Sequence, residues 1–178
     1  MTVNRSRLVA LLLAILAAAL LRLVPHPPNF TPIGAMALFS GAYLGRRWLA
    51  FAAPLAALLL SDLILGFYEG MLFQYAATLL AVGIGWAVLS RRRSTVRVGG
   101  AALGSAILFF LVSNFGVWLS SGMYPRDLGG LGACYVAAIP FFQNSLAGDL
   151  IFSALLFGGW ALAERTVPSL REARPAFA

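Results

Sequence analysis

Residues 98–119, VGGAALGSAILFFLVSNFGVWL, contain no charged side chain and decide the kind of fold that this chain can adopt. A helix needs about 20 apolar residues to cross the hydrocarbon core of a bilayer, so this stretch is long enough for one crossing. Similar stretches fill most of the sequence: 61% of the residues are hydrophobic, 11% are charged, and the mean hydropathy is +0.87. Since a soluble domain carries about 25% charged residues, an integral membrane protein is expected.

The apolar stretches predict one all-α membrane domain, residues 1–178, built as a bundle of six transmembrane helices. The predicted spans cover about 8–24, 32–44, 48–67, 72–89, 98–119 and 141–163, and a polar tail follows at 164–178. The segment Pro25-His26-Pro27-Pro28-Asn29 separates the first two spans, because proline lacks the backbone donor that a helix needs. The last apolar stretch is too long for one upright crossing, so Pro140 is expected to divide it into a short outer segment and the sixth span.

The first apolar stretch has two interpretations. Asn4-Arg5-Ser6-Arg7, followed by an apolar run, is typical of a secretory signal peptide. Arg22, however, falls where a cleavage region would lie, and bulky leucines flank it. We therefore interpret this stretch as a retained first helix.

Nearly all the arginines lie in alternate gaps between the predicted spans and predict the orientation of the bundle, and only Arg22 and Arg126 fall on the other side. The formal charge is +7, and the chain contains no lysine. Six alternating spans would place one set of arginines on a single side: Arg5, Arg7, Arg46, Arg47, Arg91, Arg92, Arg93, Arg97, Arg165, Arg171 and Arg174. By the positive-inside rule that side is cytoplasmic and holds both termini. We expect these arginines to lie beside anionic headgroups of the bacterial cytoplasmic (inner) membrane, with no role in binding nucleic acid.

Polar side chains of the predicted spans gather on the other, extracytoplasmic side. In the orientation above, Asp62, Asn114 and Trp118 lie near the outer ends of their spans, and Asp149 lies deeper. Polar groups are costly in hydrocarbon, so their convergence from several helices predicts a ligand pocket that opens to the outside. The expected residues of the pocket and its lid are Asp62, Asn114, Trp118, Tyr124, Arg126, Tyr135, Asn144 and Asp149.

Each of these residues also has a structural interpretation. A neighbouring helix can satisfy Asp62, and Asp149 can pair with Asn114 or Asn144. The aromatic residues can belong to the belt at the membrane interface, which is their commoner role.

The sequence shows no signature of an enzyme. It lacks a phosphate-binding glycine loop, a paired-histidine zinc motif and a serine nucleophile elbow. One histidine, His26, and one cysteine, Cys134, do not predict a metal site, and no cofactor is expected.

Small residues recur at four-residue spacing, which lets helices approach closely in lipid. Ala10, Ala14 and Ala18 share one face of the first span. This stripe either packs inside the bundle or docks an external membrane partner. Glycines with the same spacing, for which packing within the bundle is expected, are Gly41, Gly45, Gly100 and Gly104.

Several motifs together resemble a known group of proteins. They are NFTPIGAMALFSGA at residues 29–42, LSDLILG at 60–66, SNFGVW at 113–118 and GDL at 148–150. These motifs look like a family of small, uncharacterised bacterial membrane proteins, and the likeness covers nearly the whole chain. That family is similar to the substrate-binding S components of energy-coupling-factor vitamin transporters.

The resemblance implies a six-helix membrane fold with cytoplasmic termini. S components bind a vitamin or a related small molecule from outside, beneath the loops after helices one, three and five. Alanines in their first helix contact a membrane coupling subunit, and Ala10, Ala14 and Ala18 match that pattern. No residue of a specific vitamin pocket carries over. A related group of solitary cobalamin transporters holds cobalt with a cysteine, for which Cys134 is the candidate here.

We therefore expect a membrane-embedded protein that captures a small organic nutrient from the extracytoplasmic side. The chain has no nucleotide site, so ATPases on other chains, acting through a coupling subunit, would supply the energy. Two alternatives remain open: a stand-alone facilitator, including one of the cobalamin type, and a membrane scaffold subunit without a ligand. The expected partners are the small ligand, the lipid bilayer and the coupling subunit.

Overall fold

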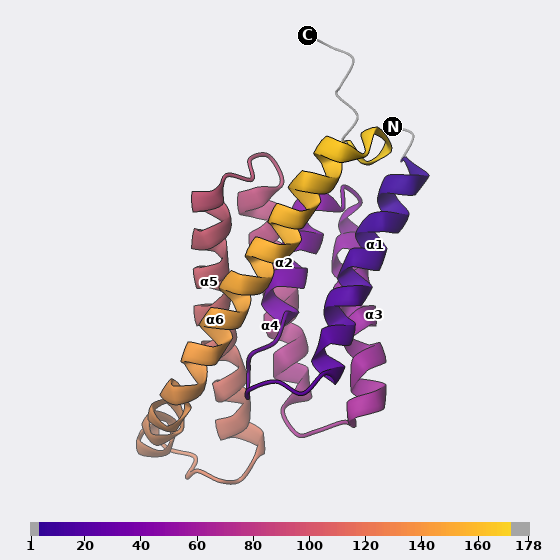
Figure 1. The fold of residues 1–178 in the computed structure, drawn as a ribbon. Coiled ribbons are helices and arrows are strands. Elements are labelled where there is room, and N and C mark those ends of the chain that lie inside the picture. Colours follow the sequence, from indigo (N-terminus) through magenta and orange to yellow (C-terminus); the bar gives the residue numbers. More distant parts are fainter. Residues whose placement is uncertain (1–3, 172–178) are drawn as a thin grey trace.

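The computed structural model describes residues 4–171 as helices joined by short connections (Figure 1). The α-helices are α1 (Arg5–Leu20), α2 (Ile33–Tyr43), α3 (Arg47–Leu65), α4 (Met71–Ile84), α5 (Thr95–Ser120) and α6 (Leu128–Thr166). Three short helical turns, η1 (Leu21–Leu23), η2 (Gly85–Leu89) and η3 (Pro168–Leu170), follow α1, α4 and α6 respectively. Residues 4–171 form no strand, which confirms the predicted all-α fold.

Five helical segments are long and apolar enough to cross a membrane, which identifies a multi-pass membrane protein. They are Arg5–Leu23, Arg47–Leu65, Met71–Leu89, Thr95–Ser120 and Leu128–Thr166. The second predicted span is not among them, because its helix is too short to cross a membrane on its own. Helix α2 has 11 residues and covers only about 16 Å at 1.5 Å per residue. That length is about half of a hydrocarbon core of ~30 Å.

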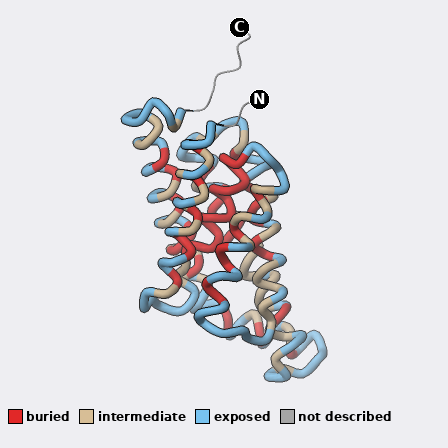
Figure 2. Tube along the Cα trace, turned by 90° about the vertical axis from the view of Figure 1, so that its right-hand side faces the viewer, coloured by how far each residue is buried: buried red, intermediate tan, exposed pale blue. Residues whose placement is uncertain are grey.

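Helix α2 lies in the centre of the bundle, and every one of its residues is buried. The other five α-helices all contact it. Figure 2 shows the same arrangement, with buried residues along the middle of the bundle and exposed residues around them. A helix that is apolar on all faces either faces lipid or forms a core, and sequence alone does not distinguish the two. Here it forms the core.

Residues 24–32 return the chain from the end of η1 into the bundle, so that α2 begins part of the way along it (Figure 1). Irregular backbone at membrane depth needs partners from the protein or from a cavity. The Phe30 N–H donates to the Pro27 carbonyl at 3.0 Å, and the Thr31 N–H donates to the Asn29 carbonyl at 3.1 Å. The prolines of this segment have no N–H to satisfy, which lowers the cost of its irregular path.

Helix α6 is continuous from Leu128 to Thr166, and Pro140 lies inside it. Figure 1 shows the start of α6 turned away from the direction of the remainder. A proline within a helix removes one backbone hydrogen bond and clashes with the preceding turn, which bends the helix. The expected division at Pro140 therefore takes the form of a bent helix and not of two helices. Of the predicted tail, residues 172–178 lie outside the described residues.

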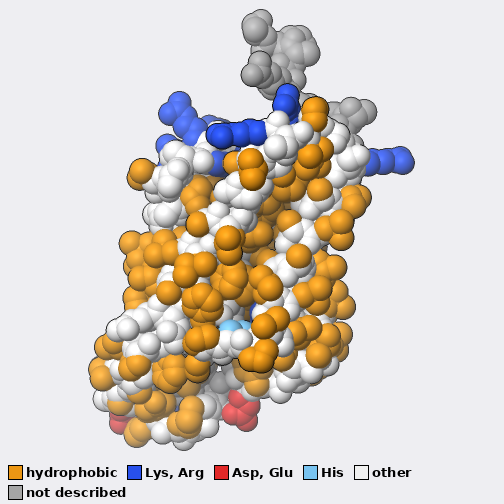
Figure 3. All heavy atoms as spheres, viewed as in Figure 1, with side chains coloured by type: hydrophobic (Ala, Val, Ile, Leu, Met, Phe, Trp, Pro, Cys, Tyr) orange, Lys and Arg blue, Asp and Glu red, His pale blue; other side chains and the backbone are white. Residues whose placement is uncertain are grey.

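Most of the described arginines lie at the same end of the bundle as the two ends of the described chain, and Arg22 and Arg126 are the exceptions (Figures 1 and 3). We call this the arginine-rich end. It comprises the start of α1, the end of α6 and the connections α2–α3 and η2–α5. Figure 3 shows acidic side chains at the opposite end and a hydrophobic band between the two ends. The structure thus has the charge segregation predicted from the sequence, and the assignment of the arginine-rich end to the cytoplasm remains a prediction.

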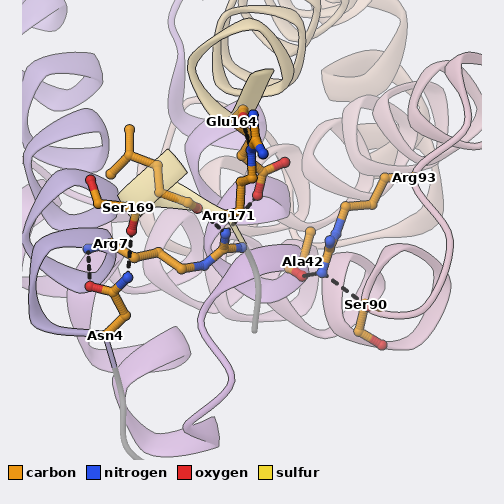
Figure 4. A network of polar contacts seen from close by, with 9 residues as sticks. Asn4, Arg7, Ala42, Ser90, Arg93, Glu164, Ser169 and Arg171 are labelled. Atoms are coloured by element: carbon orange, nitrogen blue, oxygen red, sulfur yellow. Dashed lines mark hydrogen bonds and ion pairs between the residues drawn. The ribbon is translucent and has the colours of Figure 1, made fainter. Parts of the chain in front are cut away.

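Arg7 joins α1 to the end of α6 at the arginine-rich end (Figure 4). Its Nη1 lies 2.6 Å from Glu164 Oε1 and also donates to the Leu170 carbonyl. The guanidinium lies over the rings of Tyr43 and Trp160, at 5.9 and 5.7 Å from the centroids. The contact combines an ion pair with cation–π interactions in a site that is largely buried.

Arg93 holds the end of α2 in the same region (Figure 4). Its Nη2 donates to the Ala42 carbonyl at 2.8 Å and to the Ser90 carbonyl at 3.1 Å. The last carbonyls of a helix have no partner within the helix and carry partial negative charge. The guanidinium of Arg93 therefore caps the C-terminal end of α2.

The backbone of α2 approaches α4 and the following turn η2 closely at two glycines, Gly41 in α2 and Gly85 in η2. A Cβ atom added to Gly41 would collide with the Val82 carbonyl, and one added to Gly85 would collide with the backbone of Leu38. We expect Gly85→Ala to destabilise the protein by about 1–3 kcal/mol, because backbone atoms cannot move aside as a side chain can. Thermal unfolding in detergent measures the effect.

The matched control is Gly104→Ala in α5, where nothing lies within 4 Å of the added Cβ. Alanine favours a helix over glycine by about 1 kcal/mol, so this variant should be as stable as the wild type or more stable. Equal losses of stability in the two variants would contradict the close approach of α2 and α4.

Candidate functional site

The structure divides the predicted pocket residues into three groups of interacting side chains. Asp62 belongs to the first group, at the outer ends of α3 and α4. Asp149 and Asn144 belong to the second, where α6 meets residues 24–34. The third group lies on α5, the α5–α6 connection and the start of α6, and it contains Asn114, Trp118, Arg126 and Tyr135. Tyr124 is half-buried in the same connection.

Asp62 forms a buried ion pair with Arg22. Arg22 Nη1 lies 2.8 Å from Asp62 Oδ1, and the Asp62 side chain has no exposed surface. The same guanidinium donates to the Ser61 hydroxyl, and the Tyr75 hydroxyl donates to Asp62 Oδ2 at 2.9 Å. Sequence reasoning missed Arg22 as the partner. The available signal was an arginine near the outer end of the first span, at the same expected depth as Asp62.

Tyr68 and Gln74 lie beside this cluster, and the Tyr68 hydroxyl donates to Gln74 Oε1. Burial, together with the charge of Asp62, raises the pKa of Tyr68 to about 12. The hydroxyl therefore stays protonated at physiological pH and remains a donor. The whole first group ties η1 to α3 and α4.

Asp149 lies deep in the bundle at the start of α2, with 5% of its surface exposed. Its carboxylate fills the space that a side chain at Gly34 would need. The Ala35 N–H donates to this carboxylate, and the Ser105 hydroxyl lies against it. Pro32, the residue before α2, supplies no side-chain cap. Asp149 therefore caps the N-terminal end of α2 from another helix, where the helix dipole favours negative charge.

A small cavity adjoins the Asp149 carboxylate. Its volume is about 10 Å³, which is close to the minimum for one water molecule. The residues that line it are Asn29, Thr31, Ile33, Gly34, Phe109, Ser145 and Asp149. Since α2 covers only about 16 Å between this point and the arginine-rich end, the cavity lies near the middle of the hydrophobic band.

Few contacts hold residues 24–32 against α6 beside this cavity. The Asn144 amide donates to the Pro28 carbonyl at 2.9 Å. The rings of Phe30 and Phe152 lie 5.4 Å apart between centroids. The backbone of Thr31 packs on Gly148, where an added Cβ would come within 3.1 Å of it.

The third group donates hydrogen bonds to backbone carbonyls. Asn114 donates to Phe110, Trp118 to Pro125, Arg126 to Leu119, and Tyr135 to Leu111, at 2.7–3.1 Å. The Cys134 thiol similarly donates to the Asn114 carbonyl at 3.4 Å. The bonds of Trp118 and Arg126 tie the α5–α6 connection to α5, those of Tyr135 and Cys134 join α6 to α5, and that of Asn114 lies within α5. Contact of these side chains with a ligand remains a prediction.

The alanine stripe of α1 faces the bundle interior for at least part of its length. Ala18 is 4% exposed, and Ala10 and Ala14 are half-buried against the core. This burial favours internal packing of the stripe, and docking of a partner there remains a prediction. Beside it, α1 and α3 enclose an apolar groove of about 290 Å³, lined by Leu12, Ile15, Leu16, Leu49, Ala52, Ala53, Ala56, Ala57 and Leu60.

Within residues 4–171, no three His, Cys, Asp or Glu side chains lie close enough to hold a metal ion together. Cys134 is buried in the first turns of α6. His26 lies exposed in the proline-rich segment, where its Nδ1 is 2.9 Å from the Pro27 carbonyl. The two residues belong to different elements.

Comparison with known proteins gave one match. The sequence profile of a family of unknown function (DUF6580) matches residues 2–170. No curated protein matches the chain, and neither does any solved structure.

The ion pair of the first group gives a prediction about stability. Removing one partner of a buried pair leaves an uncompensated charge, so Arg22→Met and Asp62→Leu should each cost about 3–5 kcal/mol. The double variant should be more stable than either single variant, because no buried charge remains. Thermal unfolding of all four proteins measures this coupling, and simple additivity of the two losses would contradict it.

Proposed function

We propose that this chain, which belongs to the DUF6580 family of unknown function, is a membrane-embedded binding and uptake protein for a small organic nutrient. The observation that carries the proposal is the start of α2 inside the bundle, beside a small cavity that adjoins Asp149 and residues 24–32. Transporters commonly bind their substrates near the bilayer midplane, at helices interrupted by irregular backbone. The predicted orientation makes this side extracytoplasmic.

Ligand binding requires residues 24–32 to move. A pocket for a small organic molecule has a volume of about 300–1,000 Å³, whereas the cavity beside Asp149 has about 10 Å³. Displacement of residues 24–32 from α6 breaks the Pro28–Asn144 hydrogen bond and separates Phe30 from Phe152. The ligand would then occupy the space between α6 and the start of α2.

The proposed uptake can be driven in one of two ways, which differ in their source of energy. The resemblance to S components suggests that ATPases on other chains drive uptake through a membrane coupling subunit. A stand-alone facilitator would instead carry the ligand down its gradient. Proteoliposomes that contain this chain alone distinguish the two, because only a facilitator should load them.

The hydroxyls of the cavity allow a direct test of ligand binding. We expect a small molecule to co-purify with the wild-type protein, detected by mass spectrometry of an extract of the purified protein. Ser145→Ala and Thr31→Val should each reduce its amount about 10-fold, because each removes a polar group that lines the cavity.

Ser113→Ala is the matched control for Ser145→Ala. Both hydroxyls donate to the carbonyl four residues earlier in their own helix, Phe109 for Ser113 and Phe141 for Ser145. Ser113 is not among the residues that line the cavity. Equal ligand content in the two variants, or no bound or bindable molecule across a broad panel of nutrients, would contradict the proposal.

The alternative of a scaffold without a ligand has one observation in its favour. The side chains of the third group are already satisfied by backbone carbonyls. A scaffold predicts that Ser145→Ala and Thr31→Val change only the unfolding temperature. The co-purification experiment above therefore distinguishes the two functions.

A further inference from the structure

The two acids buried inside the bundle differ in how their charge is compensated. Asp62 has the guanidinium of Arg22 at 2.8 Å. Asp149 is 5% exposed, and within residues 4–171 no arginine or histidine forms an ion pair with it. Its contacts are the Ala35 N–H, the Ser105 hydroxyl and the start of α2, all of which are formally neutral. An ionised carboxylate near the middle of a membrane is costly without a compensating cation.

The surroundings of Asp149 are rich in oxygen acceptors. A carboxylate has about four lone-pair sites, so its contacts with Ala35 and Ser105 leave capacity for a further partner. Asn29, Thr31 and Ser145, each of which carries a side-chain oxygen, are among the residues that line the same cavity. Oxygen ligands of this kind are typical of sites for hard cations.

The size of the cavity restricts the occupant. Its volume of about 10 Å³ accommodates one water molecule or an ion of similar size, and it excludes an organic cation. The cavity is lined by Asn29 and Thr31, which belong to the connection at the end of the bundle opposite the arginines. A cation would therefore reach it from that end.

We propose that Asp149, together with the oxygens of Asn29, Thr31 and Ser145, forms a binding site for a sodium ion. The bound ion compensates the carboxylate and joins residues 24–32 to α6. The sodium site shares this cavity, including Thr31 and Ser145, with the proposed nutrient site, but it forms while residues 24–32 lie against α6 and does not depend on an organic ligand. If the proposed uptake function holds as well, sodium on the extracytoplasmic side would favour the arrangement in which residues 24–32 lie against α6.

Thermal unfolding of the purified full chain in detergent tests the site. The protein is compared in sodium, potassium and choline chloride at equal ionic strength and fixed pH. Sodium should raise the unfolding temperature saturably, by about 5 °C near saturation, because it binds only the folded protein. Potassium and choline should have much smaller effects, since both are larger ions.

Three variants assign the effect to the site. Asp149→Asn should abolish the sodium response. Glu69→Gln, which changes an exposed acid in the α3–α4 connection, should retain it. Asn29→Gly should raise the sodium concentration needed for half of the effect about 10-fold. Asn29 has a φ of 63°, a conformation that glycine adopts without strain, so this variant removes only the side chain. It therefore keeps the test decisive if Asp149→Asn does not fold.

Several results would overturn the proposal. One is an identical unfolding temperature in the three salts, and another is a sodium response that persists in Asp149→Asn. A third is an unfolding temperature that changes with pH in the wild type but not in Asp149→Asn, and that does not respond to sodium. That result would mean that a proton, and not sodium, neutralises the carboxylate. Failure to find a co-purifying nutrient would leave the sodium response unaffected, so the two proposals fail separately.

Discussion

The structure depends on the capping of a short helix inside the bundle. Every residue of α2 is buried, so water cannot satisfy the unpaired backbone groups at its ends. Asp149 accepts from the Ala35 N–H at the start of α2, and Arg93 donates to the Ala42 carbonyl at its end. Each charge has the sign that the helix dipole favours at that end. Two side chains that lie far from α2 in the sequence therefore allow it to begin and end within the protein, and the remaining helices pack around it.

A central helix with capped ends also explains where the backbone packs most tightly. The carboxylate of Asp149 reaches the first turn of α2 because Gly34 has no side chain. The backbones of α4 and η2 reach α2 because of Gly41 and Gly85. Lipid tails are as apolar as leucine, so association of helices in a membrane relies on close packing and on hydrogen bonds, with no hydrophobic driving force between them. Substitution of these glycines would separate α2 from the caps and neighbours that hold it.

The sequence predicted that the helices lie in a membrane, that most arginines gather at one end of the bundle, and where most helices begin and end. These features follow from local hydropathy and from the positions of the arginines. It did not predict that α2 is a half-length core helix, since an apolar run looks the same whether protein or lipid surrounds it. Equal spacing of glycines was likewise ambiguous: Gly41 meets a neighbouring backbone, whereas nothing lies within 4 Å of a Cβ added to Gly45 or Gly104. For the buried acids, the sequence indicated depth but not partners. Arg22 and the Ala35 N–H become partners only through the path of residues 24–32 and the packing of α2.

The two ends of the bundle differ in how firmly they are held, and this difference bears on where function lies. At the arginine-rich end, Arg7 joins α1 to α6 and Arg93 joins the end of α2 to the turn before α5 (Figure 4). At the opposite end, Arg22 and Asp62 join η1 to α3, but residues 24–32 lie against α6 through one amide, one ring pair and a glycine contact. Breaking those contacts costs little compared with separating a buried ion pair. A change of shape that leaves the capped helix in place is therefore concentrated in residues 24–32. That segment lies directly beside the buried carboxylate that has no cationic partner among the described residues.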